Sequence, residues 1–448
     1  MVTVRQPPDP LGTDERFRRI VEAFDSDEFR RAMASPLIAG KYLHWDKLRF
    51  YKPPEGLSHE QWWDAVKLAR LGGRRALPLL DVNGKPFTFI LPDTVEELLH
   101  KLTLALGSNM RLEERLATKE SKDKYLISSL VEEAITSSQL EGAATTRKVA
   151  EQMLRSGRKP RDAHEQMIVN NYLAMRRINE LDGVDLSAEL VFELHRILTE
   201  KTLPDEDRGR LRLTGKASDD IAVYDNTTNE VLHKPPAAEE LPQRMTAMCA
   251  FANGELKSGF VHPIVRAIAL HFWLAYDHPF VDGNGRTARA LFYWAMKRGG
   301  YWLCEYVSIS SIIRKAPAKY LRAYLETETD ENDLTYFVIF HLQVLDRAVT
   351  ALESYIQERR DEIQRVHLKL KGVATLNHRQ RDLILHAVRH PGQEYTFASH
   401  HNSHGVTYQT ARSDLLHLEE RGLLRRVVRG REFIFLAPPD LESRLAHG

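Results

Sequence analysis

The sequence predicts a mainly α-helical protein with a helical core that carries an inserted β-hairpin, a small N-terminal accessory region and a separate C-terminal module. The first observation is length, because 448 residues exceed one ordinary core and favour roughly two to three domains. The second is an apolar spacing of three to four residues that persists from about residue 114 to 365. The third is the stretch 219–236, whose polar centre and apolar edges are typical of a hairpin.

Composition excludes several classes of protein. Hydrophobic residues make up 43% and charged residues 28%, which is typical of a water-soluble globular chain. Lys and Arg number 63 against 62 Asp and Glu, so a general nucleic-acid-coating role is disfavoured, although a local basic patch is left open. Cys249 and Cys304 lie far apart without ligand-like spacing, which argues against a disulfide framework or a cysteine-based zinc site.

The sequence also favours a cytoplasmic protein that does not span a membrane. The opening residues, "MVTVRQPPDPLG", lack the apolar core of a signal peptide. The most apolar long run, "IVRAIALHFWLAY", contains an arginine and a histidine and is too short to cross a bilayer. The cysteine usage agrees with a reducing compartment.

Residues 1–113 mix short helical patterns with strand-like segments, and we expect them to form the accessory domain. In "LPLLDVNGKPFTFILP", Asn83-Gly84 stands between two apolar runs, which is the strongest two-residue signal for a hairpin turn. No group of residues in this region indicates a chemical function.

Residues 114–365 are predicted to form the helical core. A helix over about 122–142 places Leu126, Leu130, Ala134 and Ile135 on one face and ends at Gly142, and residues 163–178 and 187–198 repeat the period. The hairpin over about 220–236 ends at Pro235-Pro236. Residues 262–276 are apolar nearly all round, which predicts a buried helix.

A second boundary is predicted near the charged stretch that precedes residue 377. We expect a linker over 366–376 and a module over 377–448. That module should contain a helix from Gln380 to Val388, a shorter helix, a third helix within 406–424 and a hairpin within 425–435.

The stretch "HPFVDGNGRTAR", His278 to Arg289, concentrates groups that suit a nucleotide polyphosphate. Gly283 and Gly285 allow close approach, so that consecutive backbone N–H groups can point at anionic oxygens. Strong helix formers follow, which puts the loop at a helix N-terminus, where the dipole favours anions.

The charged residues of this stretch add to the same interpretation. Arg286 and Arg289 are three apart on one helical face and can both contact phosphate oxygens. Asp282 is a hard oxygen ligand suited to Mg²⁺ shared with phosphates. His278 has an ordinary pKa suited to taking a proton from a nucleophile.

Other interpretations of the same letters are weaker. "GNGRTA", with Glu305 downstream, fits a loose dinucleotide fingerprint, but that fingerprint requires a preceding strand and this sequence has a helix-length run. A calcium loop starting at Asp282 fails because Arg286 and Tyr293 stand where oxygen ligands are needed. A simple helix corner would explain the glycines but not two arginines and a histidine.

The stretch resembles, at every specified position, the signature His-Pro-Phe-x-Asp-Gly-Asn-Gly-Arg-x-x-Arg of the Fic (filamentation induced by cAMP) family. The resemblance covers about residues 114–365, and the N-terminal region looks like one often fused to such domains. It implies a mainly α fold: a Fic-type helical core with a β-hairpin flap, plus the accessory region and a C-terminal winged helix-turn-helix.

The resemblance implies protein adenylylation, in which AMP moves from ATP to a Ser, Thr or Tyr hydroxyl of a protein and pyrophosphate leaves. His278 would deprotonate the hydroxyl, and Asp282 would hold Mg²⁺ on the α- and β-phosphates. Arg286 and Arg289 would hold the outer phosphates, with Arg289 on the γ-phosphate. The anion cradle would consist of Gly283, Asn284 and Gly285.

Two further segments gain meaning from the resemblance. The hairpin with Ile221, Val223 and Tyr224 falls where the family carries its flap, which can pair with an extended target segment, the alternative being a solvated connector. "SSQLEG", Ser137 to Gly142, is similar to the motif of the family's N-terminal-inhibitor class. Glu141 would then pair with Arg289 and block the γ-phosphate position, the alternative being an ordinary surface carboxylate.

Several aromatic and histidine residues are less specific. Tyr320 and Tyr324, four apart, could line an adenine site or pack in the core, and core packing is the better-supported interpretation. His262 and His271 have no metal-ligand spacing. His400 and His404 could form a metal pair, but no third ligand is evident, so we predict no metal there.

Residues 377–440 resemble a winged helix-turn-helix. Thr407 would cap the recognition helix, and its outward-facing residues would be Tyr408, Gln409 and Arg412. The predicted wing holds several arginines, namely Arg425, Arg426, Arg429 and Arg431. DNA binding and protein docking both stay open, because Glu419 and Glu420 dilute the basic character.

The sequence thus predicts an ATP- and Mg²⁺-dependent protein adenylyltransferase, autoinhibited by Glu141, with self-modification as one target. Removal of AMP from a modified protein by Glu141 and His278, or nucleotide-responsive DNA binding, are the alternatives. A homodimer is left open.

Overall fold

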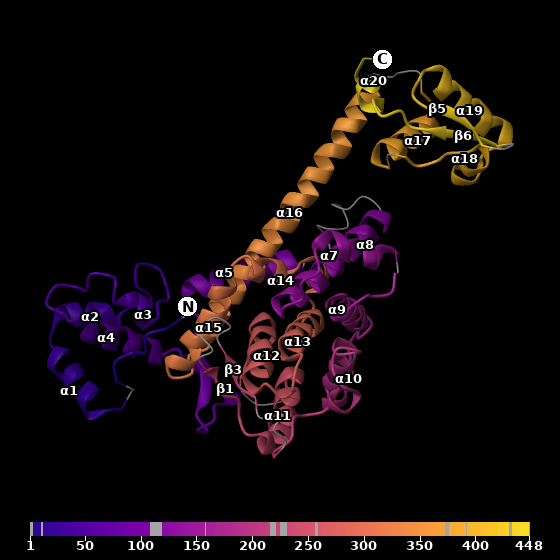
Figure 1. The fold of residues 1–448 in the computed structure, drawn as a ribbon. Coiled ribbons are helices and arrows are strands. Elements are labelled where there is room, and N and C mark those ends of the chain that lie inside the picture. Colours follow the sequence, from indigo (N-terminus) through magenta and orange to yellow (C-terminus); the bar gives the residue numbers. More distant parts are fainter. Residues whose placement is uncertain are drawn as a thin grey trace. The chain divides into compact units, whose positions relative to one another are not determined.

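The computed structural model describes residues 3–9, 12–107, 119–156, 158–215, 221–224, 231–255, 259–371, 376–390, 392–429 and 432–447. The described chain is mainly helical, which confirms the predicted fold class, and within it each sheet is a two-stranded antiparallel pair. It divides into two compact units, Met1–Leu352 and Glu353–Gly448, and the boundary falls within helix α16 (Thr335–Lys371) (Figure 1).

The first unit begins with short helices around a small aromatic core that includes Trp45, Trp62 and Trp63. The elements are α1 (Asp14–Ala23), α2 (Asp27–Met33), α3 (Trp45–Leu48), α4 (His59–Leu71), β1 (Arg75–Leu80), β2 (Pro86–Phe89) and α5 (Asp93–Gly107). Strands β1 and β2 pair on either side of the Asn83-Gly84 turn, with Arg75 opposite Phe89, so the hairpin predicted from that dipeptide is confirmed.

Buried charges attach this N-terminal part to the rest of the first unit. Lys67 Nζ lies 2.7 Å from Asp330 Oδ1, and both side chains are almost fully buried. Arg70 Nη1 donates to the Tyr336 hydroxyl at 2.8 Å. Because each of these groups would be costly to bury alone, the network fixes the accessory region onto the start of α16.

The helical core of the first unit surrounds a central pair, α12 (Pro263–Asp277) and α13 (Asn284–Arg298), which lie side by side in Figure 1. Nearly every residue of α12 is buried, as its all-round apolar sequence predicted. The remaining helices are α7 (Lys119–Leu140), α8 (Arg147–Ser156), α9 (Ala163–Asn179), α10 (Ala188–Leu198), α11 (Leu241–Asn253), α14 (Ile309–Arg314) and α15 (Pro317–Thr329).

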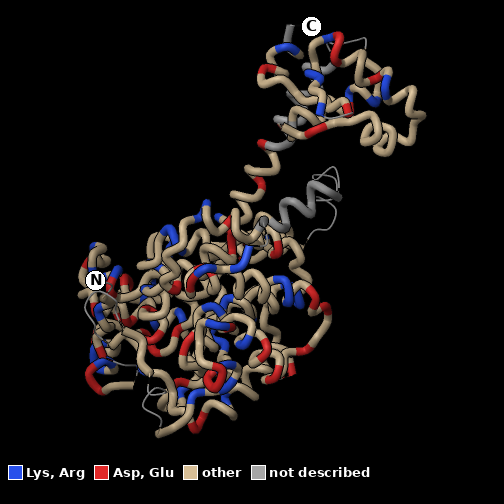
Figure 2. The backbone as a smooth tube through the Cα atoms, turned by 45° about the vertical axis from the view of Figure 1, so that its right-hand side comes forward, with Lys and Arg blue, Asp and Glu red and all other residues tan. Residues whose placement is uncertain are grey.

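The inserted hairpin consists of β3 (Val223–Tyr224) and β4 (Val231–His233), with Val223 opposite His233 and Tyr224 opposite Val231. The centre of the hairpin predicted from the sequence, residues 225–230, lies outside the described residues. Figure 2 shows basic and acidic residues interspersed along the first unit, which agrees with the near-zero net charge.

The second unit contains the end of α16, then α17 (His378–Arg389), α18 (Phe397–His404), α19 (Tyr408–Glu420), β5 (Arg425–Arg429), β6 (Glu432–Leu436) and α20 (Leu441–His447). Residues 366–371, which the sequence placed in a linker, are the last turns of α16. Thr407 caps α19 by accepting a hydrogen bond from the Thr410 N–H. Three helices followed by a hairpin is the order expected of a winged helix-turn-helix.

A capping interaction explains why α17 begins earlier than predicted. The Asn377 side chain accepts from the Gln380 N–H, and the Gln380 side chain accepts from the Asn377 N–H. Gln380 is therefore the third residue of the helix and not its first. Among the helices in the described ranges, none has the length and apolarity needed to cross a bilayer.

Candidate functional site

His278 lies in a tight turn that joins α12 to α13. It ends α12 in a left-handed conformation with φ of 46°, which is uncommon for a residue with a side chain. Gly283, with φ of 83°, then begins α13 in the same region of backbone space. The two left-handed residues reverse the chain within a few positions, so His278 and the N-terminus of α13 face the same place.

Asn284 holds this turn from within. Its side-chain oxygen accepts from the Phe280 N–H at 2.9 Å, and its side-chain nitrogen donates to the Phe280 carbonyl at 2.7 Å. The amide side chain is therefore used inside the loop. What Asn284 can offer to an anion is its backbone N–H, which as the first of α13 has no partner within the helix.

His195, on α10, holds the same turn from outside and was missed by the sequence analysis. Its Nε2–H donates to the Asp282 carbonyl at 2.8 Å, and its Nδ1 accepts from the Gly209 N–H at 2.8 Å. The ring stacks on Phe280 with centroids 3.8 Å apart. Burial lowers the pKa of His195 to about 4, so the ring is neutral and fixed in one tautomer.

His278 itself is set up as a proton acceptor. Its Nδ1–H donates to the Ala275 carbonyl at 3.1 Å, which leaves the Nε2 lone pair to accept a proton. Burial lowers the pKa of His278 to about 4. The ring is therefore neutral at pH 7, which is the form a general base needs.

Arg289 meets both residues of the predicted inhibitory motif. Its Nη2 donates to Glu141 Oε1 at 2.8 Å, and its Nε donates to the Ser137 hydroxyl at 2.8 Å. The arginine is 2% exposed. Burial alone would lower the pKa of Arg289, but the Glu141 carboxylate outweighs it and the pKa is raised.

Glu141 also lies directly against the glycine of the cradle. A Cβ placed on Gly285 would be 2.3 Å from Glu141 Oε1 and 2.9 Å from its Cδ. The carboxylate thus occupies the space that the missing side chain leaves at the N-terminus of α13. Its oxygens stand where the oxygens of a bound anion would be favoured by the helix dipole.

A buried carboxylate on α7 explains how Glu141 is held in reach. Glu133 Oε2 accepts from the Tyr293 hydroxyl at 2.9 Å, the Ser308 hydroxyl at 2.8 Å and the Ser310 N–H at 3.1 Å. These partners come from α13 and α14 and from the residue before α14, so α7 is fixed to the helix that carries Arg289. The predicted apolar face of α7 is buried at Leu130, Ala134 and Ile135.

Asp282 and Arg286 lie at the mouth of the turn and contact each other. Asp282 Oδ2 is 3.4 Å from Arg286 Nη2, and the carboxylate is 57% exposed while the arginine is 1% exposed. Arg286 Nη1 donates to the Leu198 carbonyl at 2.8 Å. Arg286 is therefore fixed by α10, and it has less freedom to reorient towards a ligand than the sequence suggested.

Tyr320 and Tyr324, on α15, use their hydroxyls inside the core. Tyr320 Oη lies 2.8 Å from His271 Nε2 and 3.0 Å from Tyr324 Oη. The Tyr324 ring packs 4.5 Å from Phe337. This arrangement favours core packing, the second of the two interpretations made from the sequence.

The histidines considered as metal ligands have other partners. His262 caps α12 by accepting from the Ile264 N–H at 3.3 Å. His400 Nε2 lies 3.2 Å from Asp414 Oδ2, and its ring lies 4.6 Å from that of His404. Within the described part of the chain, no three His, Cys, Asp or Glu residues are grouped so as to hold a metal ion.

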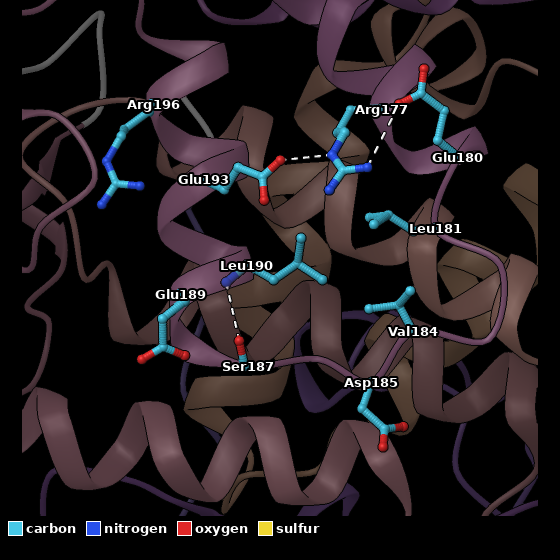
Figure 3. Close-up of a pocket in the computed structure, with 10 residues that line it drawn as sticks. All are labelled: Arg177, Glu180, Leu181, Val184, Asp185, Ser187, Glu189, Leu190, Glu193 and Arg196. Atoms are coloured by element: carbon cyan, nitrogen blue, oxygen red, sulfur yellow. Dashed lines mark hydrogen bonds and ion pairs between the residues drawn. The ribbon is translucent and has the colours of Figure 1, made fainter.

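A surface pocket of about 470 Å³ lies between the end of α9 and the start of α10 (Figure 3). Arg177 in this pocket pairs with Glu193 at 2.7 Å and with Glu180 at 3.6 Å. None of the residues of the His278–Arg289 stretch lines it. This pocket is therefore separate from the candidate site at the α12–α13 turn.

Parts of the chain are similar in sequence to known proteins. The sequence profile described as Fic/DOC family matches residues 185–296. "Protein adenylyltransferase Fic" of Drosophila sechellia is 32% identical over 163 residues, which are 35% of this chain and 30% of that protein. The protein of the same name from Drosophila grimshawi is 32% identical over 160 residues, again 35% and 30%. The chain thus matches about 30% of the length of these relatives.

A solved structure shares the fold. The crystal structure of a Fic family protein from Desulfovibrio desulfuricans G20 superposes with a TM-score of 0.52, covering 77% of this chain and 96% of that one. Its sequence identity is 18%, so the comparison concerns the fold alone. The family match spans His195 on α10, the whole α12–α13 turn and Arg289. From the signature, the fold and the sequence matches together, we conclude that residues 185–296 of this chain form a Fic/DOC family domain.

Proposed function

We propose that the chain is a protein adenylyltransferase that Glu141 holds in an inhibited state. The observation that carries the proposal is the Glu141 carboxylate, which contacts Arg289 at 2.8 Å and fills the space above Gly285. A carboxylate seated on a buried arginine and a helix N-terminus stands in for phosphate oxygens. The relatives of that name support the choice of ATP as co-substrate and a protein as acceptor.

In the proposed reaction, the hydroxyl oxygen of a Ser, Thr or Tyr attacks the α-phosphorus of ATP. His278 Nε2 takes the hydroxyl proton while the bond to the β-phosphate oxygen breaks and pyrophosphate leaves. The neutral ring, fixed by the Ala275 carbonyl, supports this role. Positioning and charge neutralisation supply most of the catalysis in such transfers.

The residues at the turn suit a magnesium ion held together with phosphates. Mg²⁺ takes hard oxygen ligands and usually binds proteins through one or two carboxylates plus substrate phosphates. Asp282 is the exposed carboxylate beside the cradle and would be that ligand. The ion would neutralise phosphate charge, while backbone N–H groups of the Gly283–Gly285 cradle would hold the anion. The Gly283 N–H donates to Asp282 Oδ1 at 2.6 Å in this structure and would have to exchange partners.

Inhibition follows from competition for Arg289. A γ-phosphate and the Glu141 carboxylate are both negative, and two such groups cannot share one buried arginine without a large electrostatic cost. While Glu141 stays, ATP would bind with its α-phosphate turned away from His278. Ser137, which also accepts from Arg289, keeps the guanidinium oriented.

The test is labelled ATP incubated with the purified chain and with Glu141→Gly, scored by mass spectrometry for AMP on protein. We expect incorporation to rise at least about tenfold, which requires about 1.4 kcal/mol of barrier relief. Glu151→Gly, another helical glutamate, is the matched control and should not gain activity. Unchanged incorporation in Glu141→Gly, with ATP and Mg²⁺ bound, contradicts the inhibitory role, and loss of AMP from a modified protein would favour the hydrolytic alternative.

For the second unit we propose contact with a DNA backbone through α19 and the β5–β6 hairpin. Tyr408 is 54% exposed at the start of α19, and Arg412 and Arg425 are exposed. Arg429 pairs with Glu394 at 2.7 Å and Arg426 with Glu419 at 3.1 Å, so part of the basic surface is already neutralised, and Arg431 lies outside the described residues. In gel-shift assays, the affinity for DNA should fall steeply as salt concentration rises. It should also fall in the double variant Arg412→Ala, Arg425→Ala. If the second unit does not retard DNA even at low salt, docking to a protein is the function that remains for it.

A further inference from the structure

Arg212, just before the flap, is tied to the turn that carries His278. Its backbone N–H donates to the Pro279 carbonyl at 2.9 Å. Its side chain donates from Nε to the His278 carbonyl at 3.0 Å and from Nη2 to the Pro236 carbonyl, just after the flap. The side chain is 6% exposed. Arg212 thus joins both ends of the flap segment to the base.

His233, on flap strand β4, makes a second connection. One ring nitrogen, Nδ1, lies 2.8 Å from Glu328 Oε2 on α15, and the other, Nε2, lies 2.7 Å from the Tyr276 carbonyl on α12. A carboxylate and a carbonyl both accept hydrogen bonds, so satisfying both requires both ring nitrogens to donate. The ring is therefore an imidazolium, and it packs on the Tyr276 ring with centroids 4.7 Å apart.

The position of this cation matters for the turn. Tyr276 is in the last turn of α12, where backbone carbonyls lack partners within the helix and positive charge is favoured. With Arg212 included, the carbonyls of residues 276, 278 and 279 all accept hydrogen bonds from residues that flank or form the flap. The backbone on both sides of His278 is fixed by the flap.

We propose that His233 and Arg212 are positioning residues that hold strand β4 and the residues flanking the flap rigidly against the His278 turn. A target hydroxyl presented along β3–β4 would then reach His278 Nε2 in a fixed geometry. This inference rests on the proposed transfer to a protein hydroxyl. Both are positioning residues because Arg212 donates to backbone carbonyls, and His233 contacts the Tyr276 carbonyl and Glu328.

The charges around His233 agree with this role. It faces Glu328 from α15, Tyr276 and Asp277 from α12, and His278 just after α12. Asp277 is paired with Arg244 from α11 at 2.7 Å, and Lys234 follows His233 just after β4. Burial alone would lower the pKa of His233, but Glu328, the Tyr276 carbonyl and Asp277 outweigh it and the pKa is raised.

The sign of the pH effect follows. Because the folded pKa is raised, the His233 connection is fully present below its unfolded pKa, about 6.5, and is lost as pH rises through the folded pKa. His278 needs to be neutral, so transfer first rises through about pH 4. The rate of AMP transfer should fall again at higher pH, as His233 loses its proton.

The activity test uses the full chain carrying Glu141→Gly, with His233→Gln, Glu328→Gln or Lys234→Gln added. We expect His233→Gln to lower kcat by about tenfold with KM for ATP unchanged, since the cradle is not touched. Glu328→Gln should keep most activity at low pH and move the falling limb to lower pH. Lys234→Gln, at the exposed residue that follows β4, is the control and should match the parent. Equal kcat and an unshifted pH profile in His233→Gln would overturn the proposal.

A second readout does not depend on activity. Amide hydrogen exchange of the peptide covering residues 231–236 should be faster in His233→Gln than in the parent and in Lys234→Gln. In the parent it should accelerate as pH rises through the His233 pKa, after correction for the intrinsic rate. If exchange behaves this way but no variant transfers AMP, the proposed function fails and the connection stands. Exchange that is unchanged in His233→Gln would refute the connection itself.

Discussion

Gly285→Ala offers a direct test of where Glu141 sits. A Cβ at position 285 would lie 2.3 Å from Glu141 Oε1, 2.9 Å from Cδ and 3.1 Å from Oε2. The whole carboxylate would have to retreat by about 1 Å to reach ordinary contact. That movement breaks the 2.8 Å hydrogen bond to Arg289. A hydrogen bond to a charged group is worth about 1.5–3 kcal/mol.

The same substitution has an opposite effect on the helix. Position 285 is the second residue of α13, where alanine is favoured over glycine by about 0.5–1 kcal/mol. We therefore expect Gly285→Ala to reduce the free energy of unfolding by about 1–2 kcal/mol in the parent chain. In the Glu141→Gly background, where the carboxylate is absent, the same change should be neutral or stabilising.

Urea denaturation of the four proteins, monitored on the first unit by tryptophan fluorescence, measures this cycle. The coupling free energy between positions 141 and 285 should be about 1.5–3 kcal/mol. Equal effects of Gly285→Ala in both backgrounds would show that Glu141 does not occupy the cradle in solution. The inhibitory mechanism would then need another explanation.

Three further outcomes are expected. His278→Ala should abolish AMP transfer while titration calorimetry still detects ATP binding, because the cradle, Asp282 and Arg289 remain; full transfer would contradict the role of the base. Asn284→Ala should lower the free energy of unfolding by about 2–3 kcal/mol through loss of both hydrogen bonds to Phe280, measured by urea denaturation, whereas a loss below 0.5 kcal/mol would argue that the turn is held mainly by His195. Lys67→Met should lower the free energy of unfolding by about 3–5 kcal/mol, because it leaves Asp330 buried without its ammonium partner. Stability close to that of the parent in the same assay would show that the network is solvated.

The sequence predicted those features that depend on local pattern. The buried α12, the Asn83-Gly84 hairpin and the capping Thr407 each depend on neighbouring residues, so period and turn chemistry were sufficient. The contact between Arg289 and Glu141 was predicted only because the family resemblance linked two distant motifs. Nothing in the spacing itself would have joined positions 148 residues apart.

Other parts of the site depend on contacts that no local pattern records. His195 binds the carbonyl of residue 282, and Arg212 binds the carbonyl of residue 278, so each recognises backbone and not a side-chain type. Arg286, whose expected contact with phosphate stays a prediction, also donates to the Leu198 carbonyl, which no spacing indicated. Backbone acceptors are present at every position of every sequence, and only the fold decides which of them a polar side chain meets.

The left-handed backbone at His278 has an evolutionary consequence. A residue with a side chain at φ of 46° costs about 1–2 kcal/mol relative to glycine. Drift alone would therefore favour glycine here, because it would stabilise the turn while removing the imidazole. Under the proposed function, histidine at this position is retained for its chemistry against the preference of the backbone, and a glycine there would exchange catalysis for stability.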